Sequence, residues 1–571
     1  MPERDSVLIG QILLSEGVIT PEQLDIGLKE QQKTGNFICA TLVNLGFASE
    51  EKIFNILSRH LNIPYVKLKD IEIEPLIIQK VAAKFSSHYK IIPVDFKDGN
   101  LIIAMVNPLD VRILDDLRLL LGIPVKGVLA SEAEITEAIR KYYGVGAETL
   151  ERIISEKSSI ADMGKTGENI QDLEAMAEDA SIIKFVNQIL TEAIKGRATD
   201  IHIEPFQDEL RTRMRVDGML YDINIPETIK YLHAAIVSRI KIMARLDIAE
   251  RRLPQDGRIK IKINSEELDL RVSILPTAFG EAVHIRILSP QFFLELVKIG
   301  LLPDNLKIIE EVIKKPHGII FVNGPTGSGK STTLYACLAR INSDSIKIIT
   351  IEDPIEYQLK GVNQIQVNPK IGLTFAVGLR HILRHDPDVM MVGEVRDYET
   401  AEIAIRAALT GHLVYSTLHT NDAAGAVTRL LDMGVEPFLV SSSLECLIAQ
   451  RLVRLICPKC RVPLEARKEI IDEIKKDIDF DPKKIELYEG KGCAECRFTG
   501  YRGRTGIHEI LTLTQPIREL ILARASSQQI KQKAVSQGMR TLRQDGLQKV
   551  LMGLTTFSEI VRVAQHEEIS E

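Results

Sequence analysis

The clearest signal in this sequence is a glycine-rich segment, Gly324–Ser331, that lies between two regular elements. The apolar run Gly318–Val322 before it is typical of a buried strand, and residues Thr332–Leu334 open a helix. Glycines allow backbone amides to turn inward onto phosphate oxygens, and the helix N-terminus adds the positive end of its dipole. We therefore predict a phosphate-binding loop made of Gly324, Pro325, Thr326, Gly327, Ser328, Gly329, Lys330, Ser331 and Thr332.

Two side chains of this loop predict its ligand. Lys330 can reach the β- and γ-phosphates of a nucleotide as a point charge, and Ser331 offers a hydroxyl ligand to Mg²⁺. A glycine-rich turn that matches the pattern by chance is disfavoured because the strand and the helix are both in place. The sequence thus predicts an ATP-hydrolysing enzyme that binds ATP with Mg²⁺.

Carboxylates follow two further strand-like runs. Lys347–Ile351 leads into the acidic segment Glu352–Glu356, and Val389–Val392 leads through a glycine into Glu394. These runs alternate with helical patterns, which indicates a largely parallel sheet whose carboxyl ends meet at one edge. A carboxylate there can hold Mg²⁺ through its waters or polarise the attacking water, so we expect Glu356 and Glu394 in the site. Which carboxylate does which task stays open, and helix capping or a solvated loop is the alternative for each.

Two histidines flank a fourth strand-like run, Leu413–Ser416. His412 precedes this run and His419 follows it at a short distance. An imidazole at a strand end beside a nucleotide can sense the γ-phosphate by hydrogen bonding. The alternative for each is a histidine whose ring nitrogens only satisfy structural hydrogen bonds.

Arginines alternate with other residues in the segment Leu210–Val216. Period-two spacing places Arg211, Arg213 and Arg215 on one face of a strand. Such a face offers bidentate donors to phosphate oxygens, as an arginine finger that reaches a neighbour's nucleotide would. A solvated sheet face is the alternative. Further arginines can add to this face, namely Arg258, Arg271 and Arg286.

Four of the seven cysteines form two Cys-x-x-Cys pairs. Cys457 and Cys460 form the first pair, and Cys493 and Cys496 form the second, after a charged spacer that can loop out. Four thiolates complete a tetrahedral Zn²⁺ site without an open position, so we predict a structural zinc site. Free thiols and a redox pair are the alternatives. The remaining cysteines are expected to be small buried apolar residues: Cys39, Cys337 and Cys446.

Length and composition predict several domains. A chain of 571 residues with 45% hydrophobic residues is too long for a single core. We expect a mixed α/β domain over residues 1–145, a flexible acidic linker over 146–180 and an α+β domain over 181–291. An α/β domain with the phosphate-binding loop follows over 292–571 and contains the zinc insertion over 457–496.

The charge balance disfavours some classes of partner. The formal net charge is −6, aromatic residues make up only 5% of the chain, and no basic stripe appears. These features argue against a nucleic-acid-binding protein, including a zinc-dependent one. No apolar run approaches the roughly 18 to 20 residues that span a bilayer, and the acidic start lacks the pattern of a secretory signal. We therefore expect a cytosolic protein.

Several motifs together resemble one family, the secretion and pilus ATPases of bacterial type II secretion and type IV pilus systems. The resemblance covers about residues 180 to 571. The motifs that carry it are Gly324–Ser331, Ile351–Tyr357, Val389–Arg396, Thr410–Asp422, the four cysteines, Asp200–Pro205, Arg215–Gly218 and Leu253–Arg258.

The resemblance implies a fold and roles for individual residues. The last domain would be RecA-like and the α+β domain PAS-like. Glu394 would be the Walker B glutamate, Glu356 the candidate catalytic glutamate, and His412 and His419 a histidine box. Arginines of the α+β domain, here Arg213 and Arg215, would complete a site across a subunit boundary.

The resemblance also implies partners. Members of the family form hexameric rings beneath an inner-membrane platform protein and convert ATP-driven domain rotation into movement of pilin subunits. A long N-terminal region and the tetracysteine favour assembly over retraction, so we expect a type IV pilus assembly (extension) ATPase of the PilB class. A type II secretion ATPase that drives pseudopilus assembly is the alternative. The protein would be cytoplasmic and peripheral to the inner membrane through its partners.

A different class of function is a nucleotide-gated adaptor that binds ATP without appreciable turnover. The carboxylates at positions 356 and 394 argue against this adaptor.

The N-terminus resembles the paired helical motif that binds cyclic di-GMP in some members of the family. The apolar spacing of the motif is kept in both copies. However, Leu8 and Phe37 stand where the motif has arginine, Cys39 replaces a glycine and His60 replaces a glutamine. Loss of both arginines removes the charged contacts to the ligand, which disfavours cyclic di-GMP as a partner without excluding it.

Overall fold

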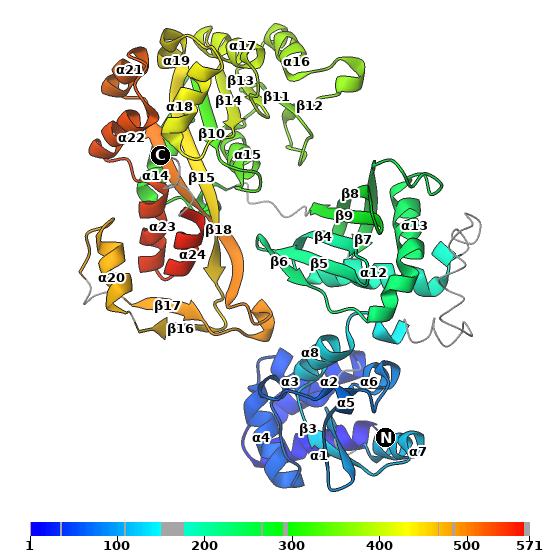
Figure 1. Ribbon diagram of the computed structural model, residues 1–571. Coiled ribbons are helices and arrows are strands. Elements are labelled where there is room, and N and C mark those ends of the chain that lie inside the picture. The colour runs from blue at the N-terminus through cyan, green and yellow to red at the C-terminus, as the bar shows by residue number, and fades with distance from the viewer. Residues whose placement is uncertain are drawn as a thin grey trace. The chain divides into compact units, whose positions relative to one another are not determined.

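The computed structural model describes residues 2–34, 37–107, 110–149, 176–263, 266–288, 295–465, 467–481 and 486–564. The chain divides into two compact units, Met1–Leu288 and Ser289–Glu571 (Figure 1). The domain boundary that we expect near Phe292 falls outside the described residues. Most of the expected linker does so as well, but its two ends are packed, because Ala147 and Ala177 are buried.

Four helices open the first unit: α1 (Pro2–Ser15), α2 (Pro21–Thr34), α3 (Ile38–Asn44) and α4 (Glu50–Leu61). Leu13, Leu42 and Leu57 are buried together in the core of these helices. The apolar spacing of the two helical repeats therefore builds a common core, although the arginines of the motif are absent.

A small three-stranded sheet follows these helices. β1 pairs with β2 in antiparallel fashion, and β2 pairs with β3 in parallel. This mixture of strands and helices is the α/β arrangement that we expect for residues 1–145. The elements are η1 (Leu68–Asp70), α5 (Pro75–Ile78), α6 (Ala83–Tyr89), β1 (Ile91–Lys97), β2 (Asn100–Met105), α7 (Val111–Leu121), β3 (Val125–Leu129) and α8 (Glu132–Tyr143).

The rest of the first unit is an α+β arrangement. Its six strands are antiparallel and lie in the order β6-β5-β4-β9-β8-β7, with α12 and α13 packed against the sheet. The elements are α12 (Ala180–Lys195), β4 (Ala198–Pro205), β5 (Leu210–Val216), β6 (Met219–Asp222), η3 (Glu227–Leu232), α13 (His233–Ala244), β7 (Gln255–Ile263), β8 (Glu266–Thr277) and β9 (Gly280–Leu288).

The second unit is built on a seven-stranded sheet in the order β12-β11-β13-β14-β10-β15-β18. Every neighbouring pair is parallel except β15 and β18, as expected for a largely parallel sheet. The strands are β10 (Gly318–Asn323), β11 (Ile348–Glu352), β12 (Val362–Gln366), β13 (Val389–Val392), β14 (Leu413–Leu418), β15 (Leu444–Ile456) and β18 (Tyr501–Thr512).

Helices connect and flank these strands (Figure 1). They are η4 (Leu296–Ile299), α14 (Pro303–Val312), α15 (Lys330–Ile341), η5 (Pro369–Ile371), α16 (Phe375–Ile382), η6 (Leu383–His385), α17 (Tyr398–Leu409), α18 (Ala423–Asp432), α19 (Pro437–Ser443), α21 (Gln515–Leu522), α22 (Ser527–Ser536), α23 (Leu542–Leu551) and α24 (Phe557–Ala564). A smaller excursion between β15 and β18 contains β16 (Arg461–Leu464), α20 (Lys468–Lys475), β17 (Leu487–Gly490) and η8 (Ala494–Cys496).

Strand β10 lies inside this sheet, between β14 and β15, and is buried along its whole length. Ile319 and Phe321 enter one hydrophobic core, while Ile320 and Val322 enter another. Side chains alternate between the two faces of a strand, so a strand covered on both faces reads as a continuous apolar run. This double burial fixes the end of β10, from which the glycine-rich loop begins.

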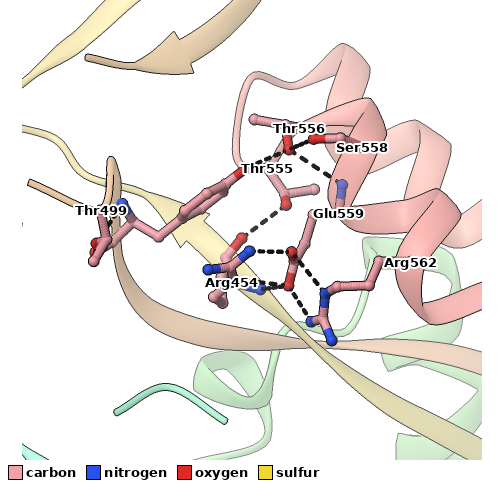
Figure 2. A network of polar contacts seen from close by, with 8 residues as sticks. Arg454, Thr499, Thr555, Thr556, Ser558, Glu559 and Arg562 are labelled. Carbon is pink, nitrogen blue, oxygen red and sulfur yellow. Dashed lines mark hydrogen bonds and ion pairs between the residues drawn. The ribbon is translucent and has the colours of Figure 1, made fainter. Parts of the chain in front are cut away.

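The last helix, α24, is attached to β15 by a buried ion pair (Figure 2). The Glu559 carboxylate accepts hydrogen bonds from Nε (3.1 Å) and Nη2 (2.7 Å) of Arg454, and from Arg562 on the next turn. The hydroxyl of Thr555 donates to the carbonyl oxygen of Arg454 at 2.7 Å. These contacts connect the C-terminal helix to a strand that pairs with β10.

Among the described residues, no helix combines the length and the apolar character that crossing a lipid bilayer requires.

Candidate active site

The carboxyl ends of four parallel strands meet at one edge of the sheet. Asn323 at the end of β10 lies opposite Leu418 at the end of β14, and Val392 of β13 lies opposite Ile351 of β11. The residues that follow these strands are therefore brought to one edge, as the sequence predicts. They are the P-loop (Gly324–Ser331), the segment that carries Glu356, and the side chains of Glu394 and His419.

The backbone of the P-loop requires glycine. Gly327 and Gly329 have φ angles of 80° and 88°, in the left-handed region that other residues rarely adopt. A Cβ atom at Gly329 would also lie 2.8 Å from Nε2 of Gln450. Lys330 begins α15, and its Nζ donates to the carbonyl oxygens of Gly324 (2.8 Å) and Pro325 (3.1 Å). The ammonium group is therefore folded over the loop at the place where phosphates would bind.

Buried polar atoms at this loop fit a ligand. Asn323 is fully buried and Ser328 is 3% exposed. Within the described part of the chain, both polar atoms of the Asn323 amide and the hydroxyl of Ser328 lack a hydrogen-bond partner. Such atoms are costly unless another group satisfies them, and a bound nucleotide would supply acceptors and donors there. Ser331, exposed in the first turn of α15, would offer its hydroxyl to Mg²⁺.

The environment of Lys330 lowers the pKa of its ammonium group to about 8. Burial is the main cause, because it penalises the charged form. The negative charge of Glu394 opposes this effect, and the positive charge of Arg451 adds to it. Lys330 therefore lies within electrostatic reach of both side chains, one on each side of the P-loop strand.

Glu394 is a buried carboxylate held by two partners. Its Oε1 lies 2.5 Å from Nη2 of Arg396, and its Oε2 lies 3.3 Å from Nε2 of His419. The glycine before it lies in a tightly packed place, because a Cβ atom at Gly393 would lie 3.3 Å from the Cα atom of Glu352. Glu394 thus has the fixed orientation that a ligand of Mg²⁺-bound water needs.

The two glutamates of the acidic segment at the end of β11, Glu352 and Glu356, differ in burial and in hydrogen-bond partners. Glu352 is 4% exposed and its carboxylate accepts a hydrogen bond from Thr350 at 2.6 Å, so it serves the core. Glu356 is half-buried in the segment that follows, and its backbone N–H donates to the Tyr335 hydroxyl at 3.3 Å. Of the two, Glu356 has the side chain that is accessible to an attacking water.

The two histidines lie at opposite ends of β14, and this corrects the expectation that both lie beside the nucleotide. His419 follows the strand at the P-loop edge. His412 precedes it, and its carbonyl oxygen accepts from Gly318 at the start of β10, while its Nδ1 lies 3.0 Å from the carbonyl oxygen of Ala407. Because β10 and β14 are parallel, His412 of the same chain lies at the edge remote from the P-loop.

Sequence reasoning missed two residues of β15 that border the loop. Asn323 pairs with Ala449, so the next residues, Gln450 and Arg451, lie level with the start of the P-loop. Oε1 of Gln450 accepts from Oγ1 of Thr333 at 2.6 Å, and Nη2 of Arg451 donates to the carbonyl oxygen of Asn421 at 3.0 Å. The sequence feature that could have identified these two residues is the apolar run before Gln450, which is typical of a further buried strand.

The predicted cationic face exists in the first unit. Leu210, Thr212 and Met214 of β5 are buried, so the intervening arginines lie on the other face of the sheet. Arg213 donates to Oε2 of Glu204 from Nε (3.0 Å) and Nη2 (2.7 Å), and Arg215 donates from Nη1 to the carbonyl oxygen of Gly218 (3.0 Å).

A row of charged residues crosses the same sheet. Its members pair directly from strand to strand in the order Arg215, Asp200, Arg286, Arg271 and Arg258. Burial opposes ionisation of the Asp200 carboxyl, but the hydrogen bonds from His284, Thr199 and Arg286 outweigh it and lower the pKa of this group well below its usual range. The row is therefore cationic, with four arginines to one aspartate, and the ionised Asp200 forms ion pairs with Arg215 and Arg286.

The four cysteines of the two pairs meet in the second unit. Their sulfur atoms all lie within 4.8 Å of one another, and three of the Sγ–Sγ distances are 3.8 Å: Cys457–Cys493, Cys460–Cys496 and Cys493–Cys496. A tetrahedral zinc ion with Zn–S bonds of about 2.3 Å places its sulfur ligands about 3.8 Å apart. The cluster therefore fits a structural Zn²⁺ site.

The fold and this edge of the sheet define a class of protein. A P-loop between a buried strand and a helix, with carboxylates after neighbouring parallel strands, is the site of a RecA-like P-loop nucleoside triphosphatase. A family model for Type II/IV secretion system protein matches residues 175–562, and the MshEN domain model matches residues 61–149. The chain belongs to the Type II/IV secretion system protein family, and it is an ATP-hydrolysing enzyme that uses Mg²⁺.

Curated relatives match the chain along almost its entire length. It is 44% identical over 559 residues to the type IV pilus assembly ATPase PilB of Myxococcus xanthus, which covers 97% of this chain and 98% of that protein. It is 43% identical over 546 residues to type II secretion system protein E of Xanthomonas campestris pv. campestris, with 94% of each chain covered. The solved ATPase DotB of Legionella pneumophila is similar in fold, with a TM-score of 0.50 at 24% identity over 67% of this chain and 96% of DotB.

Proposed function

We propose that this protein is a hexameric motor ATPase that powers polymerisation of pilins into a type IV pilus through an inner-membrane platform protein. The proposed ATPase activity is supported by the joint placement of the P-loop, Glu394 and His419 at one edge of the sheet. The pilus part is supported by the similarity to PilB of Myxococcus xanthus over 97% of this chain. The protein would act in the cytoplasm, at the inner membrane through its partners.

The alternative is a type II secretion ATPase that drives pseudopilus assembly. It is supported by 43% identity over 94% of the chain to the Xanthomonas campestris protein. Deletion of the gene in its own bacterium separates the two. We expect loss of surface pili with secretion unchanged, whereas loss of secreted proteins with pili intact would establish the alternative.

Each residue of the sheet edge has a place in the proposed reaction. Lys330 and the P-loop amides would bind the phosphates, and Glu394 would orient Mg²⁺-bound water. Glu356 would accept the proton of the attacking water as general base. His419 would report the presence of the γ-phosphate through its contact with Glu394. His412, at the other edge, has no part in this cycle within one chain.

Arg213 and Arg215 would complete the site of a neighbouring subunit in a ring. Their fixed, cationic sheet face is suited to the charge that develops on a transferred phosphoryl group. The test is ATP turnover of the purified protein as a function of its concentration. Specific activity should rise with assembly, and it should collapse in the Arg213→Ala/Arg215→Ala protein while nucleotide still binds. Arg112→Ala, an exposed arginine on α7, is the matched control.

Equal activity of a dilute monomer with and without Arg213 and Arg215 would contradict the shared site.

Binding of cyclic di-GMP is not part of this proposal. Leu8 is 47% exposed at the position of the first motif arginine, so it offers an apolar surface where the ligand needs a charged donor.

A further inference from the structure

The Tyr335 hydroxyl joins the P-loop helix to the segment that carries Glu356. Tyr335 lies in the second turn of α15 and its side chain is fully buried. The hydroxyl donates to Oε2 of Glu352, and it accepts from the backbone N–H of Glu356 at 3.3 Å. One oxygen atom thus connects the element that binds phosphate with the backbone of the proposed general base.

Glu352 serves as the anchor for this connection. Its Oε1 accepts from Oγ1 of Thr350 at 2.6 Å and from Nε2 of Gln364 at 3.0 Å, while its Oε2 accepts from Tyr335. Charge-assisted hydrogen bonds in a buried place are strong and directional. The carboxylate therefore holds the phenol in one orientation, with a lone pair directed at the Glu356 segment.

Gln364 of β12 holds the far end of the same segment. Its Nε2 also donates to the carbonyl oxygen of Tyr357 at 2.9 Å, and its Oε1 accepts from the backbone N–H of Leu359 at 2.7 Å. The backbone around Glu356 is consequently fixed on one side by the P-loop helix and on the other by β12.

Simple core packing does not require this arrangement. A phenylalanine would fill the same volume, but it would remove the hydrogen bonds of the hydroxyl with Glu352 Oε2 and with the Glu356 N–H. Tyr415 of β14 is an internal comparison, because it is also fully buried and, among the described residues, its hydroxyl has no hydrogen-bond partner.

We propose that Tyr335 is a positioning residue for ATP hydrolysis, which sets the Glu356 carboxylate relative to the P-loop helix through the backbone of its segment. The inference rests on the proposed role of Glu356 as general base. A base that is displaced from the attacking water loses rate without loss of substrate binding, because the phosphates are bound by other groups.

The test is steady-state ATP hydrolysis by the full-length Tyr335→Phe protein. We expect kcat to fall by about 10-fold or more, with KM for ATP and the affinity for ADP changed by less than about 2-fold. Tyr415→Phe, which removes an unpartnered hydroxyl from a buried ring, should keep kcat. Unchanged kcat in Tyr335→Phe, or equal losses in the two variants, would overturn the inference.

A double-mutant cycle with Glu356→Gln separates positioning from a general loss of stability. If Tyr335 acts through Glu356, Tyr335→Phe causes no further loss of kcat in the Glu356→Gln protein, whereas independent losses multiply. A multiplicative result overturns the positioning role. Substantial turnover by Glu356→Gln itself would instead refute the general-base assignment on which the inference rests.

A second variant, Gln364→Met, tests the proposal independently if the Tyr335→Phe protein does not fold. Gln364→Met removes the donors to Glu352 and Tyr357 from the opposite side and leaves α15 unchanged. We expect the same pattern, a lower kcat at similar KM. A normal kcat in Gln364→Met, with Tyr335→Phe unfolded, would also overturn the proposal.

Discussion

The imidazole of His419 lies 3.3 Å from the carboxylate of Glu394, Nε2 to Oε2, and this contact joins the ends of strands β14 and β13. Glu394 also binds Arg396, so the contact with His419 is one of two that fix the carboxylate. Under the proposed function, His419 would therefore be the histidine of this chain that responds to the γ-phosphate.

The first prediction distinguishes the two histidines that flank β14, His412 and His419. We expect His419→Ala to lower kcat by about 10-fold or more, since it frees one oxygen of the buried Glu394. His412→Ala should lower kcat less, because His412 lies at the other sheet edge. Steady-state phosphate release measures both. His317→Ala, an exposed histidine before β10, is the control. A larger effect at His412 would show that a neighbouring chain uses it.

The second prediction concerns pH and the affinity for ADP. Because burial lowers the pKa of Lys330 to about 8, the ammonium loses its proton as the pH rises through that value. Phosphate binding needs the charged form, so affinity should fall by about 10-fold between about pH 7 and about pH 9. Calorimetric titration at each pH measures this fall.

Lys330→Arg provides the matched control for that titration, since a guanidinium keeps its proton over the whole range. Its affinity is expected to be weaker but independent of pH. An equal pH dependence in both proteins would show that another group titrates.

The third prediction concerns the attachment of α24. Burial opposes ionisation of Glu559, but the hydrogen bonds from Arg562 and Arg454 outweigh it and lower the pKa to about 2 from an ordinary 4.5. A lowered folded-state pKa stabilises the fold above the ordinary value, and this stabilisation is lost as the pH falls from 4.5 through about 2. Glu559→Gln should therefore lower local stability by on the order of 3 kcal/mol near neutral pH.

Hydrogen exchange of the α24 amides measures this local free energy. The difference between wild type and Glu559→Gln should shrink as the pH falls below the ordinary carboxyl value, and Glu519→Gln, an exposed glutamate on α21, should show no difference. A pH-independent difference would mean that lost packing, and not lost charge, explains the effect.

The fourth prediction concerns the cysteine cluster. We expect one zinc ion per chain by elemental analysis of the purified protein. Cys457→Ser/Cys493→Ser should abolish zinc binding and lower the unfolding temperature of the second unit, because a structural zinc site stabilises its own fold. Cys39→Ala, at a buried cysteine of the first unit, should retain zinc. Zinc retained in the double variant would exclude the four-thiolate site.

Much of the candidate site is predictable from local patterns. The P-loop is recognised because a buried strand, a glycine turn and a helix start follow one another in the chain, and each has its own residue preference. The inward and outward residues of β5 are equally predictable, because alternation along a strand is a local property. Pairs of cysteines with two residues between them predict a metal cluster for the same reason.

Other parts depend on strand order, which the local patterns leave open. Gln450 and Arg451 border the P-loop only because β15 inserts beside β10, and nothing near these two residues in sequence marks a nucleotide site. The positions of the two histidines, His412 and His419, also depend on how the strands are arranged. Both flank one strand, and the parallel direction of β10 and β14 decides which of them reaches the loop.

The phosphate-binding loop, the clustered cysteines and the largely parallel sheet are predictable from the amino-acid sequence, because they follow from spacing and hydrophobic periodicity over short stretches. Tertiary contacts place His419, and not His412, beside Glu394. They also bury Glu352 while Glu356 stays accessible, and they connect the P-loop helix to the Glu356 segment through Tyr335. The physical reason is that each of these contacts joins side chains brought together by strand order and direction, and hydrogen bonds between such residues exist only once the sheet has formed.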